Sequence, residues 1–193
     1  MADTAVTTPL RSPLSRAADR LAAATRTCGG TIRLAELPFL TQINVRLDPK
    51  GAAADAVGPA LGLTLPAEPD TVVRAGELTA LWLGPDEWLV IDTGGGDPVA
   101  DCAKAKALHS AVDISQRNTA ILVEGAGAED VLSAGCPQDL SLAAFPVGAC
   151  SRTVLGKIEA VVWRTGEKTF RVECWRSFST YAFDLLEDAA RSA

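Results

Sequence analysis

The expected secondary-structure elements of this chain recur in the same order in its two halves. From residue 41 the hydrophobic pattern predicts a strand, a helix, three strands and a helix, and from residue 119 the series begins again. Val45 and Val123 hold corresponding places 78 positions apart, and Trp82 and Trp163 do so 81 positions apart. We therefore predict an α+β fold of tandem duplicated β-α-β-β-β-α units, each covering one face of its sheet with its own helices. The alternative is a chance likeness between two α+β stretches of similar length.

Period-two alternation, helical spacing and turn residues place the individual elements. Asp97 followed by Pro98 is typical of a helix start, and Ser177 is expected to cap the last helix. The expected strands are 41–47, 71–74, 78–83, 88–92, 112–115, 119–124, 152–155, 158–164 and 169–175, and the expected helices are 14–27, 52–61, 97–108, 128–134 and one from Ser177.

The predicted domain organisation is an N-terminal arm followed by one domain. Residues 1–13 hold two prolines and little apolar periodicity, so they are expected to be an extended arm without a core of their own. Residues 14–193 are expected to form a single domain of two α+β lobes, about 31–110 and 111–193. Leu10 and Leu14 are expected to anchor the arm on a partner subunit, the alternative being a frayed terminus.

Composition and charge exclude several classes of protein. The chain has 193 residues, of which 48% are hydrophobic and 22% charged, as in a folded globular protein. Its formal net charge is −6 and its basic residues are scattered, which disfavours nucleic acid and anionic membranes as partners. The apolar stretches are short and the start of the chain lacks the order of a signal peptide, so we expect a cytoplasmic protein.

Cysteine and histidine offer little for metal binding or nucleophilic catalysis. The five cysteines, which are Cys28, Cys102, Cys136, Cys150 and Cys174, include no pair at CxxC spacing. They are expected to be reduced and mostly buried. His109, the one histidine, lies at the end of an expected helix, where a cation complements the dipole. We therefore expect neither a metal site nor a histidine-based nucleophile.

Two glycine-rich turns and four tryptophans have both a functional and a structural interpretation. Gly94–Gly96 precedes a helix but lacks the lysine of a P-loop, and Asp97 follows it, so a linker loop is favoured over a phosphate site. The turn from Gly125 to Gly127 has Asp130 where a dinucleotide fingerprint needs its third glycine. Core packing is favoured over ligand stacking for the tryptophans, which are Trp82, Trp88, Trp163 and Trp175.

Several segments in fixed order resemble a known family. DISQR from Asp113, ILVEGAGAEDVL from Ile121 and PQDL from Pro137 resemble the N-terminal part of the aminomethyltransferase, or glycine-cleavage T-protein, superfamily. Nearly the whole chain resembles more closely the gamma-subunit family of heterotetrameric sarcosine oxidases. The further segments that carry this resemblance are RSPL from Arg11, WLGPDEWL from Trp82, FPVGACSRT from Phe145, LGK from Leu155 and FRVECWRSF from Phe170.

The resemblance implies a T-protein-like fold and a place in an oxidoreductase complex. The family enzyme oxidatively demethylates sarcosine to glycine with O2, giving hydrogen peroxide and formaldehyde, or 5,10-methylenetetrahydrofolate when tetrahydrofolate is present. The resemblance implies alpha, beta and delta subunits as partners, and it places FAD, FMN, NAD and tetrahydrofolate in them. This chain is expected to be a non-catalytic subunit without catalytic, cofactor-binding or metal-binding residues of its own.

Asp139 is the one position where the resemblance implies a candidate functional residue. The functional acid of T-proteins would correspond to Asp139, but Gln138 stands where the family has asparagine, and the later segments that complete the pocket are missing. We therefore expect Asp139 to cap its loop through backbone N–H groups. The alternatives are a stand-alone folate-binding or aminomethyltransferase-like module that uses Asp139, and an adaptor for another oxidase or dehydrogenase.

Overall fold

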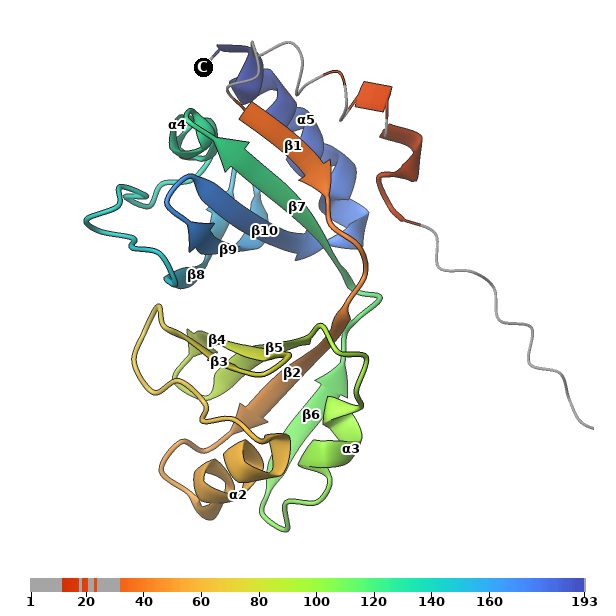
Figure 1. Ribbon diagram of the computed structural model, residues 1–193, viewed down its shortest axis with the longest axis vertical. Helices are drawn as coiled ribbons and strands as arrows, with labels where there is room; N and C mark the ends of the chain where they lie inside the picture. The colour runs from red at the N-terminus through yellow and green to blue at the C-terminus, as the bar shows by residue number, and fades with distance from the viewer. Residues whose placement is uncertain (1–11, 18, 21–22, 24–31, 193) are drawn as a thin grey trace, which may run out of the picture.

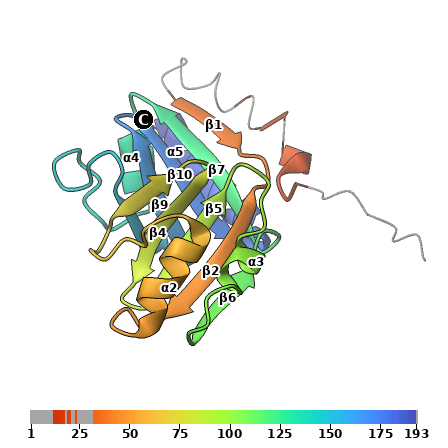
Figure 2. The same ribbon diagram turned by 60° about the horizontal axis from the view of Figure 1, so that its bottom comes forward.

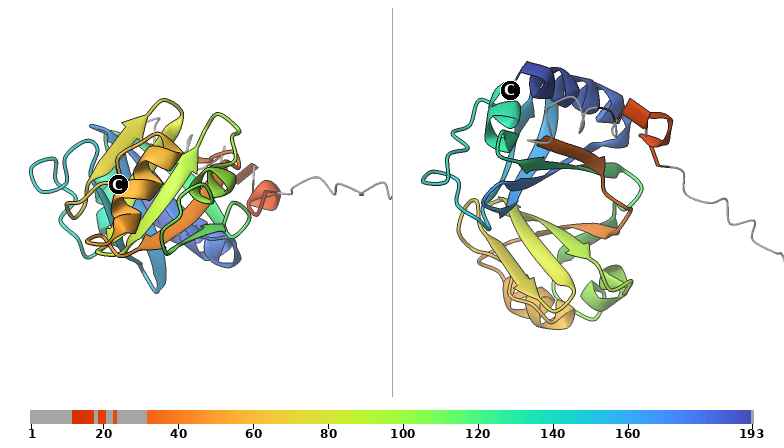
Figure 3. Two further views of the ribbon diagram at one scale, coloured as in Figure 1. Left: turned by 90° about the horizontal axis from the view of Figure 1, so that it is seen from below. Right: turned by 45° about the horizontal axis from the view of Figure 1, so that its top comes forward.

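Two antiparallel five-stranded sheets face each other, and helices cover the outer face of each (Figures 1 and 3). The computed structural model describes residues 12–17, 19–20, 23 and 32–192. The N-terminal lobe contains the N-terminal sheet with helices α2 (Ala52–Leu61) and α3 (Pro98–Cys102), and Figure 2 shows α2 lying across that sheet. The C-terminal lobe contains the C-terminal sheet with α4 (Ala128–Ser133) and α5 (Ser179–Ser192).

The strand order is the same in the two sheets once the duplication is taken into account. The N-terminal sheet has the order β3-β4-β5-β2-β6, and the C-terminal sheet has the order β8-β9-β10-β7-β1. The strands are β1 (Ile32–Glu36), β2 (Thr41–Leu47), β3 (Val72–Ala75), β4 (Leu78–Gly84), β5 (Glu87–Asp92), β6 (His109–Asp113), β7 (Asn118–Gly125), β8 (Cys150–Leu155), β9 (Ile158–Gly166) and β10 (Thr169–Trp175).

Each sheet takes one edge strand from the other half of the chain. β1 pairs with β7 in the C-terminal sheet, and β6 pairs with β2 in the N-terminal sheet. The hydrogen bonds just beyond these strands correspond as well, because the N–H of Leu37 donates to Ala120 and the N–H of Ile114 donates to Gln42, both at 2.8 Å. The structural repeat therefore begins one strand earlier than the sequence pattern predicts, and its two copies exchange that strand.

Each lobe has its own hydrophobic core between its sheet and its helices. In β2 the alternating side chains of Ile43, Val45 and Leu47 face α2, while the last helix buries Phe183 and Leu186 against the C-terminal sheet. A fully buried side chain of this size contributes about 1.5–3 kcal/mol. The sheet faces that meet each other form a third, smaller cluster, whose buried members are Leu81, Leu89, Ile91, Ile114, Cys150, Val161 and Trp163.

The α+β class and the repeated order of elements are confirmed, while several elements begin or end at residues other than those predicted. The helix expected over 97–108 ends at Cys102, although Asp97 caps it as expected by accepting the N–H of Ala100 at 2.9 Å. His109 therefore begins β6 and does not end a helix. The last helix begins at Ser179, after a 3-10 turn over Arg176–Phe178.

The N-terminal region is described only in part. Most of the predicted arm, residues 1–11, and parts of the helix expected over 14–27 lie outside the described residues, as does Cys28. Leu14 is 1% exposed and lies in the core of the C-terminal lobe, so its expected role as an anchor on a partner subunit is wrong. The side chain of Glu36 accepts the N–H of Leu14 at 3.1 Å and the hydroxyl of Thr119 at 3.1 Å, which holds this segment against the C-terminal sheet. The lobe boundaries at 31–110 and 111–193 stay a prediction.

Candidate functional site

Charged side chains are buried between the two sheets. The side-chain amide of Gln42, from β2, donates to both carboxylate oxygens of Glu173, from β10, at 3.1 and 3.2 Å. The guanidinium of Arg171 also contacts this carboxylate, with Nε donating at 2.7 Å and Nη2 lying 2.6 Å from the same oxygen. All three side chains are buried, and the donors of Gln42 and Arg171 replace the water that the Glu173 carboxylate loses on folding. We call these three residues the seam network.

Cavities lie between the lobes around the seam network. A cavity of about 290 Å³ is lined in part by Arg74, Trp163 and Arg171, and the Arg74 guanidinium lies 4.7 Å from the centroid of the Trp163 ring. A narrower one of about 60 Å³ is lined in part by Arg117 and Trp175.

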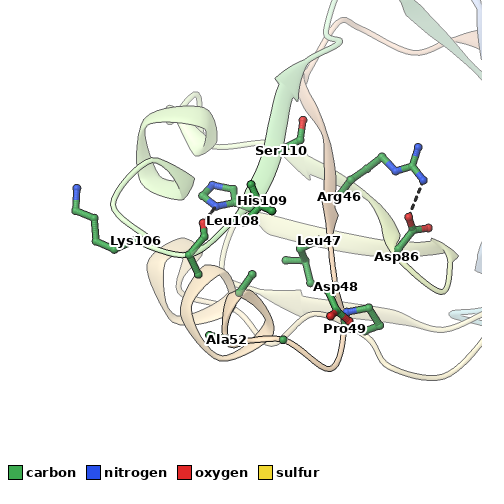
Figure 4. A pocket seen from close by; sticks show the side chains of 13 residues that line it. Arg46, Leu47, Asp48, Pro49, Ala52, Asp86, Lys106, Leu108, His109 and Ser110 are labelled. Carbon is green, nitrogen blue, oxygen red and sulfur yellow. Dashed lines mark hydrogen bonds and ion pairs between the residues drawn. The ribbon is translucent and has the colours of Figure 1, made fainter.

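An open groove of about 900 Å³ lies at the far end of the N-terminal sheet (Figure 4). Arg46 reaches from β2 to Asp86, and this 2.6 Å ion pair lowers the pKa of the Asp86 carboxyl. The Nδ1 atom of His109 lies 2.8 Å from the carbonyl oxygen of Ala107. The backbone thus positions His109, and among the described residues its side chain contacts neither a carboxylate nor a nucleophile.

Asp139 lies in the long loop between α4 and β8 and performs the expected local task. It is exposed, and its carboxylate accepts the backbone N–H of Ser141 at 2.9 Å, which lowers the pKa of Asp139. Arg164, which is 1% exposed, anchors this loop by donating to the carbonyl oxygen of Leu140. Its guanidinium also donates to the carbonyl oxygen of Glu167, in the turn between β9 and β10. Asp139 therefore shapes a loop that is anchored in the C-terminal lobe.

The glycine-rich turns form their hydrogen bonds within the protein itself. The carboxylate of Asp92, which is 4% exposed, accepts the N–H of Gly94 at 2.8 Å and that of Gly96 at 2.5 Å. A phosphate at this loop would meet that carboxylate, so the residues do not fit a nucleotide. Gly125 donates its N–H to the carbonyl of Lys168 and has a φ of 126°, which explains why glycine stands there.

The cysteines within the described residues are buried free thiols. They are Cys102, Cys136, Cys150 and Cys174. Burial raises the pKa of Cys102 to about 11 and the pKa values of Cys150 and Cys174 to about 12. Thiols in this state are poor nucleophiles and poor metal ligands. Within the same residues no group of three or more His, Cys, Asp or Glu side chains is placed to hold a metal ion, and no helix is long and apolar enough to cross a membrane.

The seam network and an exposed contact of Arg117 with Trp175 are the features that the sequence analysis did not identify. Arg171 and Glu173 are two positions apart in a strand and so lie on one face, which was a usable signal for a buried pair. Nothing local in the sequence indicates that Gln42 joins them. Trp88 and Trp163 are buried as expected, whereas Trp175 is 42% exposed and does not belong to a core.

The two facing sheets with outer helices define the class of protein. The structure matches the glycine cleavage system aminomethyltransferase T from Bartonella henselae with a TM-score of 0.62 and 14% sequence identity, over 87% of this chain and 49% of that chain. This likeness establishes a T-protein-like fold, of which the chain corresponds to about half.

The closer comparisons identify the family. Residues 46–192 match the model of the sarcosine oxidase, gamma subunit family. The chain is 34% identical over 182 residues to the sarcosine oxidase subunit gamma of Corynebacterium sp. (strain P-1), and 35% identical over 182 residues to that of Arthrobacter sp., in each case over 93% of this chain and 89% of the relative. The chain therefore belongs to the sarcosine oxidase gamma subunit family.

A solved complex contains a chain of the same fold throughout. The match is to a chain of heterotetrameric sarcosine oxidase from Corynebacterium sp. U-96 in complex with pyrrole 2-carboxylate, with a TM-score of 0.89 and 30% sequence identity. It covers 96% of this chain and 98% of that chain, so the two share their architecture from end to end.

Proposed function

We propose that this chain is a non-catalytic structural subunit of a heterotetrameric sarcosine oxidase. The observation that carries the proposal is the match over 98% of a chain of heterotetrameric sarcosine oxidase. Such a complex would oxidatively demethylate sarcosine to glycine with O2, giving hydrogen peroxide and formaldehyde, or 5,10-methylenetetrahydrofolate with tetrahydrofolate.

The chemistry of the described side chains supports a structural role. Asp92 fills its own glycine loop, Asp139 holds a turn, and the buried charges of the seam network are paired with one another. Their polar groups are used in holding the fold together. This use of side chains favours a scaffold over the alternative module that would bind folate through Asp139.

The partners and cofactors follow from the same proposal. We place the chain in the cytoplasm in contact with alpha, beta and delta subunits. FAD, FMN, NAD and tetrahydrofolate are assigned to those subunits and none to this chain. The gamma subunit would then contribute to the stability and assembly of the complex, and sarcosine turnover would depend on it indirectly.

Co-expression of this chain with the other subunits tests the proposal. We expect a tagged chain to retain the three partner subunits in equal amounts. Native mass spectrometry should give the mass of a complex with one copy of each subunit, and this complex should oxidise sarcosine. The chain expressed alone should show no flavin absorbance. A complex that forms and turns over at full rate without this chain would contradict the proposal, as would stoichiometric flavin or folate on the isolated chain.

A further inference from the structure

A stacked aromatic pair is exposed where β10 meets the last helix. Trp175 and Phe178 are 42% and 41% exposed, and their rings stack with centroids 6.1 Å apart. The guanidinium of Arg117 lies 4.3 Å from the centroid of the Trp175 ring. We call these three residues the aromatic patch. Tryptophan and arginine are among the residues that dominate binding energy at protein interfaces, whereas exposed stacked rings gain little for a chain on its own.

Hydrogen bonds fix the backbone beneath the aromatic patch. Trp175 is the last residue of β10 and pairs with Asn118 in β7. The N–H of Arg176 donates to the carbonyl of Arg117 at 2.8 Å, and the N–H of Arg117 donates to the carbonyl of Ile114 at 2.9 Å. The segment that carries the guanidinium is thus joined to the strand that carries the indole. A partner would therefore meet a preformed surface, and little conformational entropy would be lost on binding.

Charge indicates what kind of partner the aromatic patch fits. Arg117 is exposed, and none of the ion pairs formed by the described residues includes it. A second guanidinium follows at Arg176, which donates to the carbonyl of Gln116 at 3.3 Å. The aromatic patch thus presents the Arg117 guanidinium on a chain with a net charge of −6, while both acidic and basic side chains, among them Glu87, Glu159 and Arg152, line the neighbouring cavity. A carboxylate beside an apolar side chain complements the patch, since the ring face takes the apolar group and the guanidinium takes the carboxylate.

We propose that the aromatic patch is the docking surface for a partner subunit of the heterotetramer, on a segment where an apolar side chain lies next to Asp or Glu. This inference rests on the proposed function and names the surface which that function uses. The patch borders the narrower cavity between the lobes, which Arg117 and Trp175 also line, so the docked segment would lie across the junction of the two lobes.

The test measures the affinity of the chain for the complex of the remaining subunits at low protein concentration. Trp175→Ala combined with Phe178→Ala should lower the affinity at least 30-fold, the scale of an interface hot spot. Leu108→Ala is the matched control, because it truncates an apolar side chain that is 93% exposed in the groove of the N-terminal lobe. It should change the affinity less than twofold. Thermal melting of each variant checks that the fold is retained.

A charge series separates the guanidinium from the rings. Arg117→Gln should lower the affinity about tenfold and Arg117→Glu further, while Lys168→Glu, which makes the same charge change in the turn before β10, should stay within threefold. Raising the salt concentration should weaken the unchanged chain more than the Arg117→Gln variant.

The possible results distinguish the inference from the function on which it rests. If the unchanged chain binds the other subunits and the patch variants bind equally well, the aromatic patch is not the docking surface and the proposed function stands. If the unchanged chain does not bind them, both are overturned. If the patch variants abolish self-association of the isolated chain but leave binding to the other subunits intact, the occupant is a second copy and the inference is wrong.

Discussion

Gln42 and Glu173 join the two sheets by a pair of hydrogen bonds of 3.1 and 3.2 Å, although 131 positions separate them in the chain. Arg171 neutralises the same carboxylate from the neighbouring position on its strand face. The contact between the lobes therefore combines an apolar cluster with one buried charge pair. Removing one member of such a pair costs more than removing both, because the remaining charge is left without a partner.

Glu173→Leu is expected to lower the free energy of unfolding by about 3–5 kcal/mol, since it leaves the Arg171 guanidinium buried and unpaired. Urea denaturation followed by circular dichroism measures this change. The double variant Arg171→Leu with Glu173→Leu should recover most of the loss. Glu159→Leu, at an exposed position, should change stability by less than about 0.5 kcal/mol. A double variant as unstable as the single one would show that the buried charge is not the source of the effect.

Arg164→Met is expected to loosen the loop that contains Asp139. The methionine keeps the apolar stem but removes the donors to Leu140 and Glu167, together with the contact of the guanidinium over the Phe170 ring at 4.4 Å. We expect a loss of about 3 kcal/mol in stability, since hydrogen bonds from a charged donor contribute about 1.5–3 kcal/mol each, and faster proteolysis within residues 136–149.

Arg152→Met is the control for the loop, because its side chain is 34% exposed and its 3.1 Å ion pair with Glu87 lies outside the loop. Its stability cost should stay below about 1 kcal/mol, with proteolysis unchanged. Equal proteolysis in the Arg164→Met variant and the unchanged protein would mean that the loop is held by other contacts.

The sequence predicts the repeated elements because alternation and helical spacing are local properties. It does not predict the exchange of β1 and β6, because the pairing partner of each strand lies in the other half of the chain. The same long-range pairing explains the short helix α3. Residues beyond Cys102 have good helix propensity, but the chain must turn to bring His109 beside Leu47 in the N-terminal sheet.

In the candidate site, too, local features could be predicted from the sequence and long-range contacts could not. The local tasks of Asp97 and Asp139 could be predicted, since each side chain caps the backbone two or three positions ahead. The pairing of Gln42 with Glu173 in the seam network could not, because it depends on the two sheets meeting face to face. The exposure of Trp175 also depends on tertiary context, since a strand-end tryptophan has the same local pattern whether or not a helix covers it.

Asp139→Ala in the assembled enzyme is expected to reduce sarcosine turnover less than tenfold, a change of about 1.4 kcal/mol in the barrier. A residue with a direct chemical role contributes roughly 10²–10⁴-fold. Steady-state kinetics of the purified complex measures the effect. Because the pKa of Asp139 is lowered by the Ser141 N–H, the stabilisation from this bond is present above the ordinary pKa of 3.8 and is lost as pH falls through the lowered value. A loss of turnover beyond a hundredfold with assembly intact would make Asp139 a catalytic residue.

The buried thiols are expected to react with a thiol reagent only after unfolding. In a Cys28→Ser background, which removes the cysteine outside the described residues, the native protein at pH 8 should react at least 100-fold more slowly than the protein in urea. Burial raises the pKa values of Cys150 and Cys174 from the ordinary 9.0 to about 12, so the unfolded chain ionises first. Their contribution to stability should be constant below pH 9 and fall as pH rises from 9 towards 12. Rapid reaction of the native protein would contradict the burial of these thiols.

The strand exchange predicts which fragment of the chain can form a complete sheet. Residues 41–113 contain all the strands of the N-terminal sheet, from β2 to β6. A fragment of residues 31–110 instead carries β1 without its partner β7 and lacks most of β6. We therefore expect the 41–113 fragment to unfold cooperatively in urea and the 31–110 fragment to unfold at a lower urea concentration with a shallower transition. Both fragments expose the same inner sheet face, so the difference reports on the edge strands. A fragment of residues 31–110 at least as stable as 41–113 would mean that the exchanged strands contribute little to the stability of the lobe.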